Sequence, residues 1–271
     1  MTAAVGAANP GAHTYAVFGG RLASTLPLPE LQPLDAPASE YDWTLEVVDG
    51  PAPVLDEARV EGEEALDTGA TLRLLRTAGV SRLEYEDTGV YDVSRDGRRI
   101  VWYRVPGADA RLVRADILGR VLALALRARD TESLHASAVV LGAGALAFVA
   151  PRGHGKSSLA TALVRAGATL LTDDTLAVRV GAPPLALPGV CTLRLAADSA
   201  AALRQALPAT LPVLPPGGIK QAIRIERVAT ESVPLLGVYE LVPRVAAPGA
   251  AAERYPQKCD ERVLRSIINS R

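Results

Sequence analysis

The segment ALAFVAPRGHGKSSLATALVRAGATLLTDD, residues 145–174, decides which fold we expect for this chain. It opens with the apolar run Ala145–Ala150, which has strand length and no polar alternation, as in a strand buried on both faces of a sheet covered by helices. Pro151–Gly155 cannot continue a strand, and the following apolar residues keep helical spacing as far as Gly167, the expected C-cap. A second apolar run, Thr169–Thr172, leads to two adjacent aspartates. The order predicts a strand, a glycine loop, a helix and a neighbouring strand that ends in the acid pair.

The glycine loop and the start of the helix are typical of a phosphate-binding site. Backbone N–H groups of such a loop and of the helix start converge on one point, which favours an anion. Lys156 adds a cation for the outer phosphates of a nucleotide, and Ser157 offers a hydroxyl to Mg²⁺. The sequence therefore predicts cofactor contacts from six consecutive residues: Gly153, His154, Gly155, Lys156, Ser157 and Ser158.

The match to the phosphate-loop pattern G-x-x-x-x-G-K-[ST] is imperfect, because Ala150 stands where the first glycine belongs. The alternative is an ordinary glycine-rich turn that carries a surface lysine. Composition favours the phosphate loop, since the chain has 29 basic residues and only Lys156, Lys220 and Lys258 are lysines. A compact ammonium fits the narrow space of such a loop better than the rigid fork of arginine. We interpret His154 as a variable loop side chain rather than a catalyst.

The composition argues against several classes of function. The net charge is −1 over 271 residues, and no basic stripe alternates with aromatic residues, so we expect no nucleic-acid partner. The N-terminus lacks the basic and apolar regions of a signal peptide, and the apolar stretch Ile117–Leu126 is too short to span a bilayer. Cys191 and Cys259 lie far apart and have no metal-ligand spacing. We expect a cytoplasmic protein with reduced thiols and no membrane partner.

The chain is expected to have two parts, 1–107 and 108–271. Strand-like runs and the Asp96-Gly97 turn make the first part a small, mostly antiparallel β region without a catalytic constellation. Pro106-Gly107 breaks the chain, and Asp109 can cap a helix that runs to about Arg129. The predicted strands of the first part are His13–Phe18, Trp43–Val48, Leu72–Arg76, Arg82–Asp87, Val90–Ser94 and Arg99–Val105.

The second part is expected to contain more strands and two more helices. The strands His135–Leu141 and Ala145–Ala150 flank a Gly-Ala-Gly turn. Helical patterns follow at Asp198–Leu207 and Lys258–Asn269, and the Pro- and Gly-rich stretch Leu211–Gly218 predicts a loop.

The segment Leu134–Val180 resembles the C-terminal catalytic domain of HPr kinase/phosphorylase. More narrowly, it is similar to the shorter HPr-kinase-like proteins of peptide-modification pathways, such as lasso-peptide tailoring kinases. The family motif has a histidine before the loop, a phosphate loop and an Asp-Asp pair, which fall at His135, Ala150–Ser157 and Asp173-Asp174. The resemblance implies an α/β fold, with a P-loop kinase core like that of phosphoenolpyruvate carboxykinase after the small β region.

The resemblance also implies an ATP- and Mg²⁺-dependent serine kinase that acts on a small peptide or protein, and it leaves a homo-oligomer open. By resemblance, Asp173 is the base that takes the proton of the substrate serine, and Asp174 and Ser157 hold Mg²⁺. His135 would lie beside Asp173 and tune its proton affinity, and Lys156 completes the catalytic set. The chemistry agrees, because a hydroxyl nucleophile needs a carboxylate to accept its proton and phosphoryl transfer needs charge neutralisation. The alternatives are solvated loop carboxylates for the acid pair and a core histidine for His135.

Two departures from the family pattern keep other functions open. Arg152 replaces the small polar residue usual in the loop, and Thr192-Leu193-Arg194 stands where the bifunctional enzymes carry Glu-x-Arg. The arginine is present and the carboxylate is absent, which leaves a second metal ligand and the reverse, phosphorylase activity open. The remaining alternatives are a nucleotide-binding regulatory protein without catalysis, an HPr serine kinase, and a small-molecule kinase.

Overall fold

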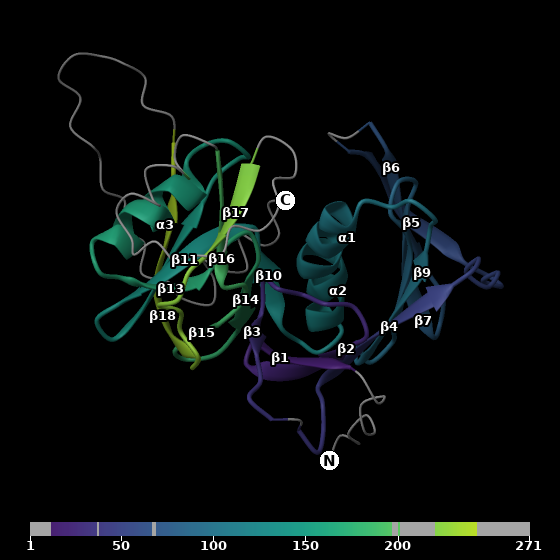
Figure 1. The fold of residues 1–271 in the computed structure, drawn as a ribbon, viewed down its shortest axis with the longest axis horizontal. Helices are drawn as coiled ribbons and strands as arrows, with labels where there is room; N and C mark the ends of the chain where they lie inside the picture. The colour runs from purple at the N-terminus through teal and green to yellow at the C-terminus, as the bar shows by residue number, and fades with distance from the viewer. Residues whose placement is uncertain (1–11, 37, 67–68, 197–199, 201–219, 243–271) are drawn as a thin grey trace. The chain divides into compact units, whose positions relative to one another are not determined.

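The computed structural model describes residues 12–36, 38–66, 69–196, 200 and 220–242 (Figure 1). The chain forms two compact units, Met1–Thr131 and Glu132–Arg271. The division falls after the helical segment that follows Pro106-Gly107, whereas the sequence placed it at 107/108. The helical segment belongs to the first unit because it is tied to that unit's strands and loops. Thr88 Oγ1 donates to Asp116 Oδ2 at 2.6 Å, and Arg114 Nε donates to Glu30 Oε1 at 2.8 Å.

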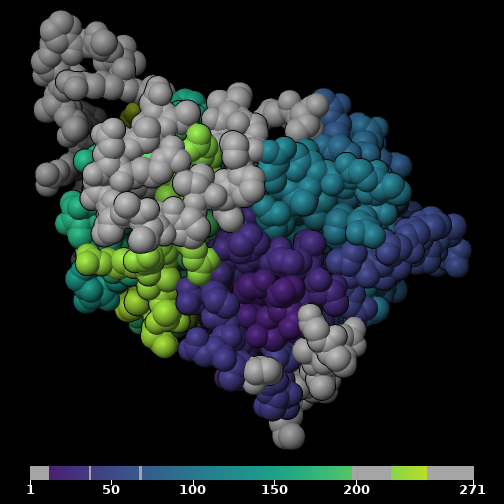
Figure 2. All heavy atoms as spheres, viewed as in Figure 1, coloured from purple at the N-terminus to yellow at the C-terminus, as the bar shows by residue number. Residues whose placement is uncertain are grey.

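Nine strands form the sheet of the N-terminal unit, in the order β3-β1-β2-β4-β9-β8-β7-β6-β5. The pairs β2–β4 and β4–β9 are parallel, and the other neighbours are antiparallel. Figure 2 shows the first strands, in purple, as one continuous area of surface. The structure has a strand at each of the six predicted positions, but the strands β2, β3 and β5 were not predicted. The sequence of β5, RVEGEEA, has no apolar alternation. The bounds are β1 His13–Val17, β2 Gly20–Ser24, β3 Gln32–Pro33, β4 Trp43–Asp49, β5 Arg59–Ala65, β6 Thr71–Arg76, β7 Val80–Tyr85, β8 Gly89–Ser94 and β9 Arg99–Arg104.

The predicted helix of the N-terminal unit is present in three consecutive pieces. They are α1 Ala110–Asp116, the π-helical turn η1 Ile117–Val121 and α2 Leu122–Arg127. Asp109 is the N-cap, as expected, and its carboxylate accepts a hydrogen bond from Arg111 N at 2.8 Å. The helices lie beside the sheet, with α2 against β8 (Figure 1). No helix in the described ranges combines the length and the apolar composition needed to cross a membrane.

The sheet of the C-terminal unit has seven strands in the order β10-β14-β15-β18-β12-β11-β13. Only β12 and β18 pair in parallel among the strand pairs of the described residues in this sheet. A separate antiparallel pair joins β16 and β17. The bounds are β10 Glu132–Leu134, β11 Ala136–Leu141, β12 Gly144–Val149, α3 Lys156–Arg165, β13 Thr169–Thr172, β14 Leu176–Arg179, β15 Leu185–Leu187, β16 Thr192–Ala196, β17 Lys220–Arg224 and β18 Val233–Glu240.

The expectation of an α/β, phosphoenolpyruvate-carboxykinase-like P-loop kinase core is wrong. Both units are mostly β with large mixed sheets, and α3 is the one helix of the C-terminal unit whose full extent the structure describes. Parallel strands need long crossovers, usually helices, whereas strands joined by short turns pair antiparallel. Here β11 and β12 are joined by Gly142-Ala143, which makes them an antiparallel hairpin. Apart from Ala200, the predicted helices Asp198–Leu207 and Lys258–Asn269 and the loop Leu211–Gly218 lie outside the described residues.

The central strand β12 is buried on both faces, as its uninterrupted apolar sequence predicted. Ala147 and Val149 belong to one hydrophobic cluster of the unit, while Phe148 packs in a second cluster with Ala160 and Val164 of α3. Helix α3 therefore covers one face of the sheet, against β11, β12 and β13. This packing holds the N-terminus of α3 beside the carboxyl end of β12.

Candidate functional site

The glycine loop joins β12 to α3 and presents backbone donors at the start of the helix. Gly153 and Gly155 have φ values of 83° and 88°, a region where a side chain is strained. A Cβ at either position would meet nothing within 4 Å, so glycine serves the backbone conformation and the surface there is open. Gly155 is the N-cap of α3, and no side chain caps the helix. Because Leu159 N donates to Gly155 O at 2.8 Å, the amides of Ser157 and Ser158 lack an intrahelical acceptor and suit an anion.

Lys156 is buried, which excludes the surface lysine of an ordinary turn. Its side chain folds back over the loop, where Nζ donates to Ala150 O at 2.8 Å and to Pro151 O at 3.4 Å. Ala150 is not among the residues with positive φ, so alanine replaces the first motif glycine without backbone strain. His154 is exposed, and its Nδ1 lies 3.1 Å from Arg152 O.

Asp173 is a buried carboxylate, only 2% exposed, that meets three different elements. Ser137 Oγ of β11 donates to its Oδ1 at 2.5 Å, and Ser157 Oγ of α3 donates to the same oxygen at 3.0 Å. Arg194 N of β16 donates to its Oδ2 at 2.9 Å. Burial raises the pKa of the Asp173 carboxyl, and the three donors oppose that rise. The sequence predicted that the strand before the acid pair is the neighbour of β12. In the structure β11 lies between β12 and β13. Ser157, in the first turn of α3, makes the contact with Asp173.

Asp174 is half-exposed and has a different set of partners. Its φ of 76° is uncommon for a residue with a side chain and occurs where the surrounding structure imposes it. Arg194 Nη1 donates to its Oδ2 at 2.9 Å, and His135 Nδ1 lies 3.3 Å from its Oδ1. The two neighbouring carboxylates thus face different environments, one in the interior and one at the surface.

His135 contacts Asp174 and not Asp173, beside which the sequence placed it. It lies between β10 and β11 with its side chain exposed, which excludes the alternative of a core histidine. Besides the contact with the Asp174 carboxylate, its Nδ1 is 2.9 Å from Asp174 O.

Two contacts of the acid pair were not anticipated from the sequence. Ser137 is fully buried and binds Asp173, yet its only signal is a hydroxyl two residues after His135 in an otherwise apolar strand. Arg194 was recognised as a remnant of Glu-x-Arg, but its contacts with both aspartates depend on how β16 is placed.

The donor set fits a magnesium ion that shares its coordination with a nucleotide. Ser157 Oγ and Asp173 Oδ1 are hard oxygen ligands that already lie 3.0 Å apart. Mg²⁺ commonly binds one or two protein oxygens, keeps several waters and takes the remaining ligands from phosphates. Within the described part of the chain, no group of three or more His, Cys, Asp or Glu residues could hold a metal ion. The phosphates would therefore have to complete the site.

Comparison with known proteins does not identify the chain. A scan against protein-family models found no match, and a search of curated proteins found no significant match. The function must be argued from the residues of the site and their geometry.

Proposed function

We propose that the C-terminal unit binds Mg²⁺ and ATP at the glycine loop and transfers the terminal phosphoryl group to a serine hydroxyl of a peptide or small protein. The observation that carries the proposal is the hydrogen bond from Ser157 Oγ to Asp173 Oδ1, because it joins the start of α3 to the acid pair. The resemblance to HPr kinase/phosphorylase, and above all to the shorter peptide-modifying relatives, supports the same reaction. A cytoplasmic location, where ATP is abundant, is part of the proposal.

The loop amides and Lys156 would hold the phosphates. Binding requires the Lys156 ammonium to exchange the carbonyl of Ala150 for phosphate oxygens. Ser157 and Asp173 would hold Mg²⁺, which when bound neutralises negative charge on the phosphates. These groups position the donor and stabilise its charge, which is the main requirement of phosphoryl transfer.

The contacts support a reversal of the two aspartate roles expected from the sequence, in which Asp173 was the base and Asp174 the metal ligand. Asp173 is buried and bound to Ser157, so it belongs to the metal side of the site. Asp174 is half-exposed and can be reached by a peptide. In the proposed step the serine oxygen attacks the γ-phosphorus, the P–O bond to ADP breaks, and the hydroxyl proton passes to Asp174. His135 orients that carboxylate from the surface side.

The test separates the two aspartates by measuring binding and turnover in parallel. Asp174→Asn should bind Mg²⁺ and ATP like the wild type but lose transfer to serine-containing peptides, assayed with γ-labelled ATP. Asp173→Asn should lose the magnesium dependence of ATP binding. Glu226→Gln removes an exposed acid from the same unit and should change neither. Transfer that survives in Asp174→Asn would refute its role as base, and an absence of ATP binding in the wild type would refute the proposal as a whole.

A nucleotide-binding regulatory protein without catalysis is the second candidate, and one contact favours it. Arg194 Nη1 donates to Asp174 Oδ2 at 2.9 Å, so a guanidinium already occupies one oxygen of the carboxylate that would have to meet the substrate hydroxyl. In addition, the buried Thr192 stands where the bifunctional enzymes have a carboxylate. This candidate predicts tight ATP binding, no turnover with any peptide, and no change in cellular function for Asp174→Asn.

A further inference from the structure

The N-terminal unit contains a polar pocket of about 450 Å³ that the proposed reaction does not use. It lies where β6 and β8 end and β7 begins, next to the last turn of α2. Three arginines line it, Arg76, Arg95 and Arg127, and none of its described lining residues is acidic. We call this site the arginine pocket.

Two of the three guanidinium groups have no counter-charge among the residues that the structure describes. Arg76 Nε donates to Glu61 Oε2 at 2.8 Å, so its charge is balanced. Within the described ranges, the side chains of Arg95 and Arg127 form no hydrogen bond and no ion pair. Arg127 lies in the last turn of α2, where the helix dipole favours a cation, but Arg95 has no such reason to be there. Like charges gathered around one pocket repel each other unless an anion lies between them.

A serine hydroxyl that lines the arginine pocket also has no partner among the described residues. Ser81 is 7% exposed and lines the pocket, yet its side chain has no hydrogen bond to any residue that the structure describes. Thr77, which lines the same pocket, differs: its Oγ1 accepts from Gly79 N and Val80 N at 3.2 and 3.0 Å. The Ser81 hydroxyl is therefore available to donate a hydrogen bond to a ligand in the pocket.

Regular structure holds the pocket residues in place. Arg76 and Ser81 are direct partners in the ladder of β6 and β7. After β8, the chain turns through Gly97, which has a φ of 70° and lies so close to α2 that a Cβ would be 2.3 Å from Ala125 O. This close approach brings Arg95 next to the end of α2, so the arrangement exists before any ligand binds.

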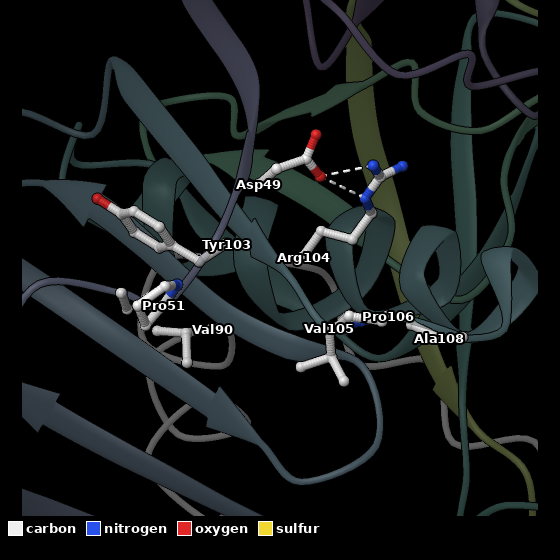
Figure 3. Close-up of a pocket in the computed structure, with 11 residues that line it drawn as sticks. Asp49, Pro51, Val90, Tyr103, Arg104, Val105, Pro106 and Ala108 are labelled. Atoms are coloured by element: carbon white, nitrogen blue, oxygen red, sulfur yellow. Dashed lines mark hydrogen bonds and ion pairs between the residues drawn. The ribbon is translucent and has the colours of Figure 1, made fainter.

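A second pocket of the same unit provides a contrast. It has a volume of about 730 Å³ and is lined mainly by apolar side chains such as Pro51, Val90 and Tyr103 (Figure 3). The arginine at this second pocket, Arg104, is already neutralised, because its Nε donates to Asp49 Oδ1 at 2.8 Å. Of these two pockets, the arginine pocket is the one in which unpaired cations and an unpartnered serine hydroxyl occur together among the described residues.

We propose that the arginine pocket binds a small oxyanion with at least two negative charges, either a phosphate ester or a polycarboxylate. Arg95 and Arg127 would each donate two hydrogen bonds to the anion, since the planar fork of arginine matches both carboxylate and phosphate. Ser81 would donate its hydroxyl at the base of the pocket. The inference does not rest on the proposed kinase reaction, because every residue involved belongs to the N-terminal unit.

The experiment uses the full chain labelled with ¹⁵N-arginine and follows the side-chain Nε–Hε resonances by NMR. The resonances of Arg95 and Arg127 are assigned with Arg95→Gln and Arg127→Gln, which are exposed positions and should fold. One sample is titrated with pyrophosphate and another with citrate. We expect both resonances to shift together and to saturate with one Kd. The anion with the lower Kd identifies the phosphate or the carboxylate class.

Variants decide whether the shifts report a specific site. Arg95→Gln and Arg127→Gln should each raise the Kd roughly tenfold, as expected for a charge-assisted pair, and Ser81→Ala should raise it by a smaller factor. Arg104→Gln removes the same charge from the second pocket and should leave the Kd unchanged. The proposal is overturned if neither anion gives a saturable shift, if both arginine variants bind like the wild type, or if Arg104→Gln weakens binding as much as they do.

Discussion

Each unit of this protein buries a carboxylate, and the two carboxylates are held in different ways. In the N-terminal unit, Asp92 accepts two hydrogen bonds from the buried guanidinium of Arg82. The Nε and Nη2 atoms lie 2.6 and 2.8 Å from its two oxygens. Arg82 Nη1 donates a third hydrogen bond, to Pro53 O, at 2.8 Å. In the C-terminal unit, the donors to Asp173 from described residues are all neutral: two serine hydroxyls and one backbone amide.

The difference separates a structural pair from a site that can accept a cation. A buried carboxylate that is paired with a guanidinium has its charge neutralised and needs no further partner. The hydrogen bond to Asp92 also raises the pKa of Arg82. A buried carboxylate with neutral donors keeps an unbalanced charge, and burial accordingly raises the pKa of Asp173. The first arrangement fixes the fold, while the second retains affinity for a proton or a metal ion.

The largest effect should come from breaking the complete pair. Arg82→Met leaves Asp92 buried without a counter-charge, which should lower the free energy of unfolding of the N-terminal unit by about 3–5 kcal/mol. Both tryptophans, Trp43 and Trp102, lie in this unit, so urea unfolding followed by tryptophan fluorescence measures it directly.

The double variant Arg82→Met/Asp92→Leu is the matched control for this pair. It removes both charges and should recover most of the loss. If Arg82→Met were as stable as the wild type, the contrast between the charge-paired Asp92 and the unpaired charge of Asp173 would not hold.

The next effect should be on activity in the C-terminal unit. Lys156→Ala removes the cation of the glycine loop and should lower phosphoryl transfer by roughly 10²–10³-fold, the usual loss when one preorganised donor is removed. Arg152→Ala removes an exposed cation from the same loop and should have a much smaller effect. Turnover of labelled ATP with a serine peptide provides the measurement. Equal losses in the two variants would show that the loop attracts anions only through its overall charge.

A smaller effect, of opposite sign, is expected for stability at Asp173. Asp173→Asn removes a charge that burial disfavours and should stabilise the C-terminal unit by roughly 0.5–2 kcal/mol at neutral pH, the typical range when a strained functional group is relieved. Hydrogen exchange of peptides from β11 and β13, measured over a series of urea concentrations, compares the unfolding free energy of the variant with that of the wild type.

The advantage of Asp173→Asn over the wild type should depend on pH. Burial raises the folded-state pKa of Asp173 above the ordinary value of 3.8, so the folded protein binds the proton more readily than the unfolded chain. The cost of the charged form is therefore absent below pH 3.8, grows as the pH rises from 3.8 to the raised pKa, and is complete above it. The two proteins should converge in stability as the pH falls. A constant difference at every pH would mean that the variant acts through packing.

The smallest effect is expected at the N-cap of α1. Asp109→Ala should lower the stability of the N-terminal unit by about 0.5–1 kcal/mol, and Asp109→Asn, which can still cap, should lose less. The hydrogen bonds from Arg111 lower the pKa of Asp109 to about 2, so the capping contribution should persist at neutral pH and fade between pH 3.8 and 2. Tryptophan fluorescence at a series of pH values follows this loss.

Features that depend on local backbone preference could be predicted from the sequence. Gly153 and Gly155 have the left-handed conformation that a glycine loop requires, Asp109 caps α1, and Asp96-Gly97 makes the turn between β8 and β9. In each case, the residue types within a few positions determine the conformation. The strand positions were predicted for the same reason, because alternation and apolar runs are local properties.

Pairing and side-chain partners could not be predicted in the same way. The strand–loop–helix pattern occurs in sheets of different connectivity, and nothing in Ala145–Ala150 indicates that β18, far along the chain, is the parallel neighbour of β12. The different surroundings of the two aspartates depend on the positive φ of Asp174 and on Ser137, a single hydroxyl in an apolar strand. Such contacts are set by tertiary packing, which a single sequence does not show.

The most direct test of the central claim is the magnesium dependence of ATP binding, measured by isothermal titration calorimetry on the wild type and on Ser157→Ala. Ser157 is the only residue that links the helix start to Asp173 in the hydrogen bonds of the described residues, so it should couple the ion to the nucleotide. We predict that wild-type protein binds ATP at least tenfold more tightly with Mg²⁺ than with EDTA, a difference of about 1.4 kcal/mol, and that Ser157→Ala abolishes this difference. ATP binding that is equally tight with EDTA, or a Ser157→Ala variant that keeps the full magnesium effect, would contradict a shared site of glycine loop and acid pair.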